Sequence, residues 1–134
     1  MHDLSDIKQT ETNIVELKLP DMEETPLMNP DGTPMTIEVF GLFSDRYREL
    51  VDAQQNARIR KASKSGGKIS FTAEEVRENR LNLMVGCVKS WNITLNGECP
   101  PCTPDEIKRV FKTYPFIRVI VEATMESPDN FLQS

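Results

Sequence analysis

Hydrophobic and polar residues alternate with a period of two in two stretches near the start of the chain, residues 12–19 and 35–40. In the first stretch one face carries Val15, Leu17 and Leu19, and the other carries Ile14, Glu16 and Lys18. This period is typical of half-buried strands. Residues 20–34 lie between them and contain the turn sequence Pro30-Asp31-Gly32-Thr33. We therefore predict an antiparallel β-hairpin with a long loop over residues 20–34.

A spacing of three and four residues replaces this alternation after Gly41. Ser44 suits an N-cap, because its hydroxyl oxygen can accept a hydrogen bond from an amide of the first helical turn. We expect a helix from Asp45 to about Ala62, with one side made of Tyr47, Leu50, Val51, Gln54 and Ala57. Residues 61–70 follow as a basic segment with glycine and serine, which predicts a mobile loop.

The next helix is expected to be the central core helix. Thr72 and Glu75 fit a capping box, in which each side chain pairs with a backbone amide of the other end of the first turn. The apolar positions that follow recur at intervals of three and four: Val76, Leu83, Met84, Cys87, Val88 and Trp91. This stripe predicts a helix from residue 73 to about Ser90.

Turn and cap signals divide the rest of the chain. Asn96-Gly97 predicts a turn, and Thr103-Pro104-Asp105-Glu106 predicts a second capping box with proline at the first helical position. Three elements are expected to follow: a helix to about Tyr114, a helix from Phe116 to about Met125 opened by Pro115, and a last turn at Ser127-Pro128 that carries Phe131 and Leu132.

These elements predict one α+β domain over residues 1–134, an N-terminal antiparallel β-hairpin packed on a bundle of about four helices. A length of 134 residues suits a single hydrophobic core. Residues 1–11 are expected to form a flexible N-terminus. There is no internal repeat and no linker that would divide the chain.

Composition narrows the classes of function. A net charge of -5 disfavours nucleic acid as a partner, because phosphate binding needs clustered lysine and arginine. The basic stretch Arg58–Lys68 lacks interleaved aromatic residues for base stacking, which favours a solvated loop. The first residues lack the pattern of a secretory signal, and apolar runs are too short for a membrane span. With an odd number of cysteines, we expect a cytoplasmic protein without a membrane partner.

Cys99-Pro100-Pro101-Cys102 is the sharpest chemical signal, because this spacing can form a redox disulfide or supply two thiolates to a metal. A redox pair of the thioredoxin type would follow a strand at a helix N-terminus, whereas this pair precedes Thr103 in a loop. Zinc would need two more ligands, and the candidates are Cys87, in the core stripe, and His2, near the terminus. Two ordinary loop cysteines are favoured, with a small redox or metal-binding module as an alternative.

Catalytic patterns are weak in this sequence. His2 is the sole histidine, which all but excludes histidine-based nucleophilic catalysis. The carboxylate pairs Glu23-Glu24 and Glu74-Glu75 fall in a loop and at a helix start, where solvated roles are usual. Ser65-Gly66-Gly67-Lys68 lacks the glycine spacing of a phosphate loop. We therefore expect no enzyme, no catalytic residue, no cofactor and no metal.

Two regions resemble phage proteins. Residues 35–41 and 44–48 are similar to the start of small tailed-phage proteins, in which a strand ends at glycine and a serine caps a helix. The second match consists of Gly86-Cys87-Val88-Lys89-Ser90-Trp91-Asn92, Asn96-Gly97-Glu98, Cys102-Thr103-Pro104-Asp105-Glu106, Tyr114-Pro115-Phe116-Ile117-Arg118 and Asp129-Asn130-Phe131-Leu132. It looks like the C-terminal half of tail assembly chaperones of long-tailed bacteriophages.

The resemblance implies a non-enzymatic chaperone made during phage or prophage tail morphogenesis, in the cytoplasm of the host bacterium. Such a protein binds the tape measure protein, keeps it soluble and helps to recruit the major tail tube protein. The chain departs from the family at Val119-Ile120-Val121, where more polar residues are common, so no binding residue is transferred. A structural minor tail or head-tail joining protein is the alternative, and homo-oligomerisation stays open.

Methionines suggest one further contact surface. The side chain of methionine adapts to varied partners. Met22, Met28 and Met35 lie in or beside the predicted hairpin loop, where we expect them to be exposed. The hypothesis is a soft partner-binding surface on this loop.

Overall fold

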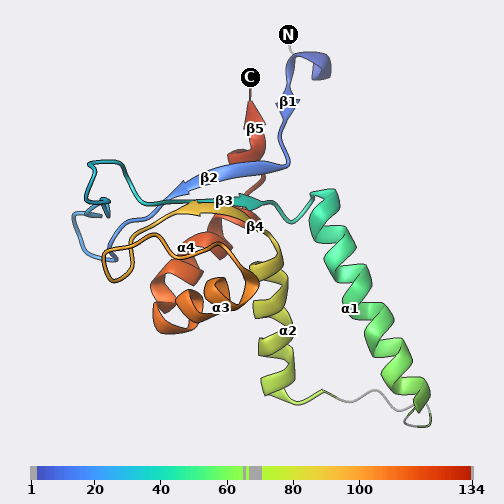
Figure 1. The fold of residues 1–134 in the computed structure, drawn as a ribbon. Helices are drawn as coiled ribbons and strands as arrows, with labels where there is room; N and C mark the ends of the chain where they lie inside the picture. The colour runs from blue at the N-terminus through green and yellow to red at the C-terminus, as the bar shows by residue number, and fades with distance from the viewer. Residues whose placement is uncertain (1–2, 65, 67–70, 134) are drawn as a thin grey trace.

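A three-stranded antiparallel sheet and four α-helices form the core in the computed structural model, which describes residues 3–64, 66 and 71–133 (Figure 1). The sheet consists of β2 (Thr12–Glu16), β3 (Thr36–Phe40) and β4 (Val88–Asn92). The helices are α1 (Asp45–Lys64), α2 (Ala73–Gly86), α3 (Pro104–Thr113) and α4 (Pro115–Glu126). Short elements lie near the two ends: η1 (Leu4–Asp6), β1 (Lys8–Gln9), η2 (Pro128–Phe131) and β5 (Leu132–Gln133). The predicted α+β class is confirmed.

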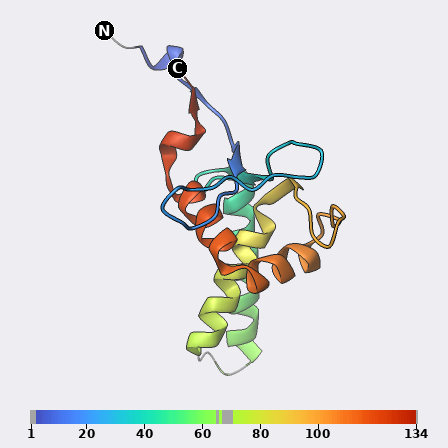
Figure 2. The same cartoon turned by 90° about the vertical axis from the view of Figure 1, so that its left-hand side faces the viewer.

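The predicted hairpin forms the first two strands of the sheet. Strand β2 pairs antiparallel with β3, with Val15 opposite Ile37, and the sheet order is β2-β3-β4. Helices α2, α3 and α4 lie on one side of this sheet in both views (Figures 1 and 2). Val15, Ile37 and Val39 are buried in the core, while Ile14 of the opposite face is exposed. The period of two therefore predicted the buried face of both strands correctly.

The long hairpin loop is tied together by its own backbone. The Leu17 amide donates to the Met35 carbonyl at 3.0 Å, and the Met35 amide donates to the Leu27 carbonyl at 2.9 Å. The Leu27 amide closes the ring by donating to the Leu17 carbonyl at 2.9 Å. Met35 packs against the core, so its predicted exposure is wrong, whereas Met22 and Met28 are exposed.

The predicted core helix is wrong beyond Gly86, where α2 ends. Residues 88–92 turn back as β4 and pair with β3, so that Trp91 lies opposite Ile37. The buried residues of α2 are Leu81, Met84 and Val85, and Val76 of the predicted stripe is half exposed. Valine and tryptophan suit a strand, and the open edge of β3 offers hydrogen bonds that a longer helix would leave unmade.

Helix α1 begins where the sequence predicted but runs further. Ser44 caps it, because its Oγ accepts from the Tyr47 amide at 3.1 Å. Residues 61–64 of the predicted mobile loop belong to α1, and Ala62 is buried. Residues 65 and 67–70 of that loop lie outside the described residues. Ala57, predicted on the packed side, is exposed, while Arg58 is half-buried with its guanidinium 4.4 Å from the Phe71 ring centre.

The threonine half of both predicted capping boxes is confirmed, as is the predicted turn, whereas the reciprocal glutamate half is wrong. Thr72 Oγ1 accepts from the Glu75 amide at 3.1 Å, and Thr103 Oγ1 accepts from the Glu106 amide at 3.4 Å. The glutamate side chains instead pair with Lys61 and Arg109. Asn96-Gly97 forms the turn, with φ of 54° and 80°.

The two ends of the described chain lie beside each other (Figure 1). Residues 1–11, predicted to be flexible, include η1 and β1, and β1 pairs antiparallel with β5. The Thr10 amide donates to the Phe131 carbonyl at 2.7 Å, and the Phe131 side chain is fully buried. The predicted last turn is therefore packed at Phe131, whereas Leu132 is half exposed.

Candidate functional site

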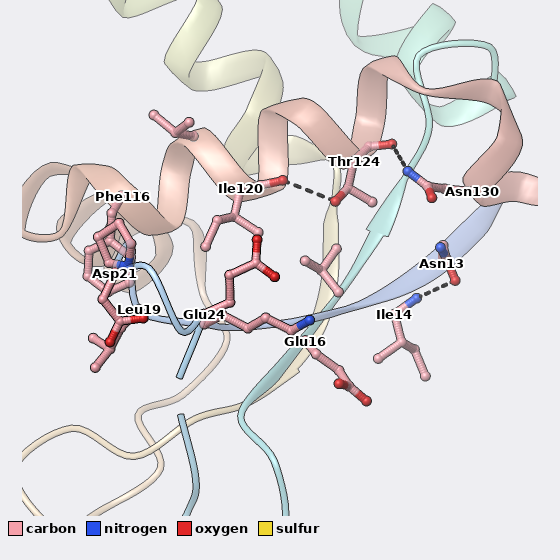
Figure 3. A pocket seen from close by; sticks show the side chains of 14 residues that line it. Asn13, Ile14, Glu16, Leu19, Asp21, Glu24, Phe116, Ile120, Thr124 and Asn130 are labelled. Atoms are coloured by element: carbon pink, nitrogen blue, oxygen red, sulfur yellow. Dashed lines mark hydrogen bonds between the residues drawn. The ribbon is translucent and has the colours of Figure 1, made fainter. Parts of the chain in front are cut away.

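A groove of about 720 Å³ runs between β2 and α4. Figure 3 shows strand and helix side by side, with Ile120 of α4 pointing toward the strand and Phe116 lying near Leu19 and Asp21, which follow it. Val119 of α4 also lines the groove, and 56% of its surface is exposed. Leu19, which follows β2, is 38% exposed at one end. Aliphatic side chains at both sides of this groove thus remain open to solvent.

A second hollow of about 310 Å³ lies beside the first, because Leu19 and Phe116 line both. Its walls are almost entirely apolar and come from the hairpin loop, the segment after β4, α3 and α4: Leu17, Leu19, Leu27, Met35, Ile93, Thr94, Leu95, Val110, Tyr114, Phe116 and Ile117. We name the two hollows together the apolar groove. Its two parts share the side chains of Leu19 and Phe116.

The rim of the apolar groove is acidic. Glu16, Asp21 and Glu24 line it, with Lys18 as the one cation among the lining residues. The Thr25 amide and hydroxyl donate to the Asp21 carboxylate at 3.0 and 2.8 Å. The backbone hydrogen bond from Thr25 is the main reason that the pKa of Asp21 lies below its ordinary value. Asp21 therefore keeps its negative charge at neutral pH.

Glu24 brings a carboxylate close to the apolar wall. Its backbone has a φ of 49°, in the left-handed region that a non-glycine residue seldom adopts. Figure 3 shows its side chain reaching from the hairpin loop toward Ile120 of α4. The apolar groove thus offers apolar contact and negative charge within the same short stretch.

The three cysteines do not come together as a site. Cys99 and Cys102 are free and exposed, whereas Cys87 is fully buried in the core, as predicted. Burial raises the pKa of the Cys87 thiol to about 11. Partial burial, and then the neighbouring Cys99, raise the pKa of Cys102, which lowers its thiolate fraction. His2 lies outside the described residues, and within residues 3–64, 66 and 71–133 no three histidine, cysteine or carboxylate side chains converge.

Charged side chains of α2 form ion pairs that join this helix to its neighbours. Glu75 pairs with Lys61 at 3.8 Å, which ties the start of α2 to the end of α1. Arg80 joins α2 to α4, since its guanidinium lies 2.6 Å from Glu122 and 3.1 Å from Glu126. Most of the segment Ser65-Gly66-Gly67-Lys68 lies outside the described residues.

Two aromatic residues, Tyr114 and Phe116, lie at the candidate site. Tyr114 is 37% exposed and lines the apolar groove together with Phe116. Trp91 is half-buried, and its Nε1 donates to the Pro100 carbonyl at 2.8 Å. The one sequence feature that could have indicated the groove is the apolar run Val119–Val121. In the structure Val121 is buried, whereas Val119 is exposed.

Comparison of the chain with protein-family models, with curated proteins and with solved structures finds no match. None of the helices in the described part of the chain has both the length and the apolar character needed to cross a membrane.

Proposed function

We propose that this protein is a non-enzymatic chaperone that binds an apolar segment of a client protein in the apolar groove. The exposed apolar surface of this groove, bordered by charged residues, supports the proposal, because such surfaces mark protein contacts. A client segment held there would remove Val119 and Leu19 from water along with its own apolar side chains. Binding of this kind keeps an aggregation-prone chain soluble and needs no catalytic group.

The resemblance to tail assembly chaperones supplies the client. Under this proposal the apolar groove binds the tape measure protein in the host cytoplasm, and the complex then helps to recruit the major tail tube protein. Residues 114–118 carry part of that resemblance, and three of them, Tyr114, Phe116 and Ile117, line the groove. The family likeness and the candidate site therefore coincide at the start of α4.

The proposal is tested by co-expression with the tape measure protein, followed by affinity capture and a comparison of client solubility. Val119→Asp places a charge in the apolar groove, where a bound apolar segment would bury it without a partner. Val76→Asp is the matched control, since Val76 is on another helix and is 51% exposed compared with 56% for Val119. We expect Val119→Asp to weaken capture at least about tenfold, equivalent to ~1.4 kcal/mol.

Either of two results would contradict this proposal. A client that is equally soluble with and without the protein would exclude the chaperone role, and detection of the chain in purified particles would then support a virion component. Equal loss of capture in Val119→Asp and Val76→Asp would exclude the apolar groove as the binding site. The comparison is valid only if both variants are folded, which is checked by thermal unfolding monitored by circular dichroism.

A further inference from the structure

The outer edge of β2 presents backbone groups to one side of the apolar groove. Strand β2 is at the edge of the sheet. The Leu17 amide donates to Met35 and the Gly41 amide donates to Glu11, both at 3.0 Å and in the register of the β2–β3 pair. Hydrogen bonding alternates along an antiparallel pair, so the odd-numbered residues of β2 face β3 and the even-numbered ones face outward.

These outward groups are open for pairing. Within the described part of the chain, the amide and carbonyl of Glu16 and the carbonyl of Ile14 have no hydrogen-bond partner. The Ile14 amide is bound only by the side chain of its neighbour Asn13, at 2.9 Å (Figure 3). The edge therefore carries outward donors and acceptors with which an added extended strand could pair.

The surroundings define the side chains that such a chain needs. Side chains of an added strand would alternate between the α4 side and the opposite side of the sheet. On the α4 side they would contact Phe116 and Val119, which require apolar groups. On the other side they would meet Glu16, which points away from α4 in Figure 3 and favours a basic neighbour across the strands.

Charge decides which kind of chain fits. Among the residues that line the groove beside β2, three are acidic, Glu16, Asp21 and Glu24, and one is basic, Lys18. A second copy of this protein would bring the same acidic edge, and the chain as a whole has a net charge of -5. A basic segment of a different protein is therefore the better complement.

We propose that an extended segment of the partner, with alternating apolar and lysine or arginine side chains, pairs with the outer edge of β2 as an additional strand. This inference rests on the proposed function and specifies its mode: the client is held by backbone hydrogen bonds as well as by apolar contact. The pairing spans Ile14 to Lys18, and the apolar groove receives every second side chain of the segment.

A proline at residue 16 provides a selective test. The Glu16 amide faces outward, so Glu16→Pro removes an edge donor without breaking the β2–β3 ladder. Glu16→Thr is the matched control, because it removes the same charge but keeps the amide. The probe is a fluorescent peptide of about ten residues, the length of a long strand, with alternating valine and lysine. We expect Glu16→Thr to weaken binding a few-fold and Glu16→Pro to weaken it more than tenfold.

Amide hydrogen exchange of the unmodified protein gives a second measurement that does not depend on the proline variant. The peptide should slow hydrogen exchange of the Glu16 amide at least about tenfold, which corresponds to a protection free energy of ~1.4 kcal/mol. The Leu17 amide is already bonded to Met35 and is the internal reference. A peptide of alternating valine and glutamate should have no effect on either amide.

Equal peptide affinity of Glu16→Pro and Glu16→Thr, with unchanged exchange at Glu16, would overturn the proposal. So would a homodimer that Glu16→Pro dissociates, because the edge would then be occupied by a second copy. Capture of the tape measure protein separates this inference from the proposed function. If Glu16→Pro captures the client normally, the strand pairing is wrong and the function stands; if the wild type captures none but the peptide protects Glu16, the function is wrong and the edge site stands.

Discussion

The Thr94 hydroxyl donates a hydrogen bond to Asn29 Oδ1 at 2.6 Å, although 65 residues separate the two in sequence. Asn29 is 7% exposed, and its amide nitrogen lies within 3.3 Å of the Pro34 and Asn92 carbonyl oxygens. One buried side chain thereby fastens the hairpin loop to the segment that follows β4. Both segments contribute walls to the apolar groove, so Asn29 also holds the shape of the candidate site.

Replacement of Asn29 by alanine should lower the free energy of unfolding by about 2–3 kcal/mol, because several buried groups lose a partner at once. Urea denaturation measures the change. Asn82→Ala is the control, since Asn82 is exposed on α2 and its loss should alter stability by less than ~0.5 kcal/mol. Similar stability of the two variants would show that the Asn29 contacts contribute little.

Close packing of α1 on α2 depends on Gly86. A Cβ atom at this position would lie 2.7 Å from Leu50 Cδ1 and 2.9 Å from Leu50 Cδ2. We expect Gly86→Ala to destabilise the protein by about 1 kcal/mol, because the end of the Leu50 side chain must shift and the gain in helix propensity offsets part of that cost. Leu50→Ala in the same chain should relieve the contact, so the double variant should lose less stability than the two single variants combined. Strict additivity in denaturant unfolding would exclude this contact as the cause.

The buried thiol of Cys87 should make stability depend on alkaline pH. Its pKa is raised from the ordinary 9.0 to about 11, so the unfolded chain releases the thiol proton at lower pH than the folded one. The stabilisation from this group is therefore complete below pH 9 and is lost as the pH rises toward 11. Wild type should lose stability relative to Cys87→Ala across this window, as measured by denaturant unfolding at each pH. A constant difference between them would contradict the burial effect.

Cys99 and Cys102 should be dispensable for folding and for client capture. Both are exposed, and neither has a partner in a disulfide within the described chain. The double variant Cys99→Ser/Cys102→Ser should unfold at the same temperature as wild type and capture the tape measure protein equally well. Loss of capture in a fully folded double variant would instead support the redox or metal-binding alternative.

Local signals predicted the parts of the fold that depend on neighbouring residues. The Thr103 cap needs only the amide of Glu106, and the Asn96-Gly97 turn needs only two residues that tolerate positive φ. The end of α2 was not predictable in this way. Cys87, Val88 and Trp91 fit a helical spacing as well as a strand, and the choice was made by the open edge of β3, which is distant in sequence.

The candidate site was less predictable than the fold. Exposure of Val119 and burial of Val121 depend on where α4 crosses the sheet, which the apolar run alone does not specify. The outward backbone groups of β2 depend on which strand is at the sheet edge. Sequence patterns indicate which residues are apolar, but tertiary packing decides which of them remain open to a partner.

The pairing of β1 with β5 has a consequence for the order of events on the ribosome. Lys8 lies opposite Gln133, so β1 has no strand partner until residues 132 and 133 have left the exit tunnel. The β2–β3 hairpin needs only residues up to Phe40 and can close much earlier. A nascent chain arrested before Leu132 would therefore retain the hairpin but leave β1 without its strand partner.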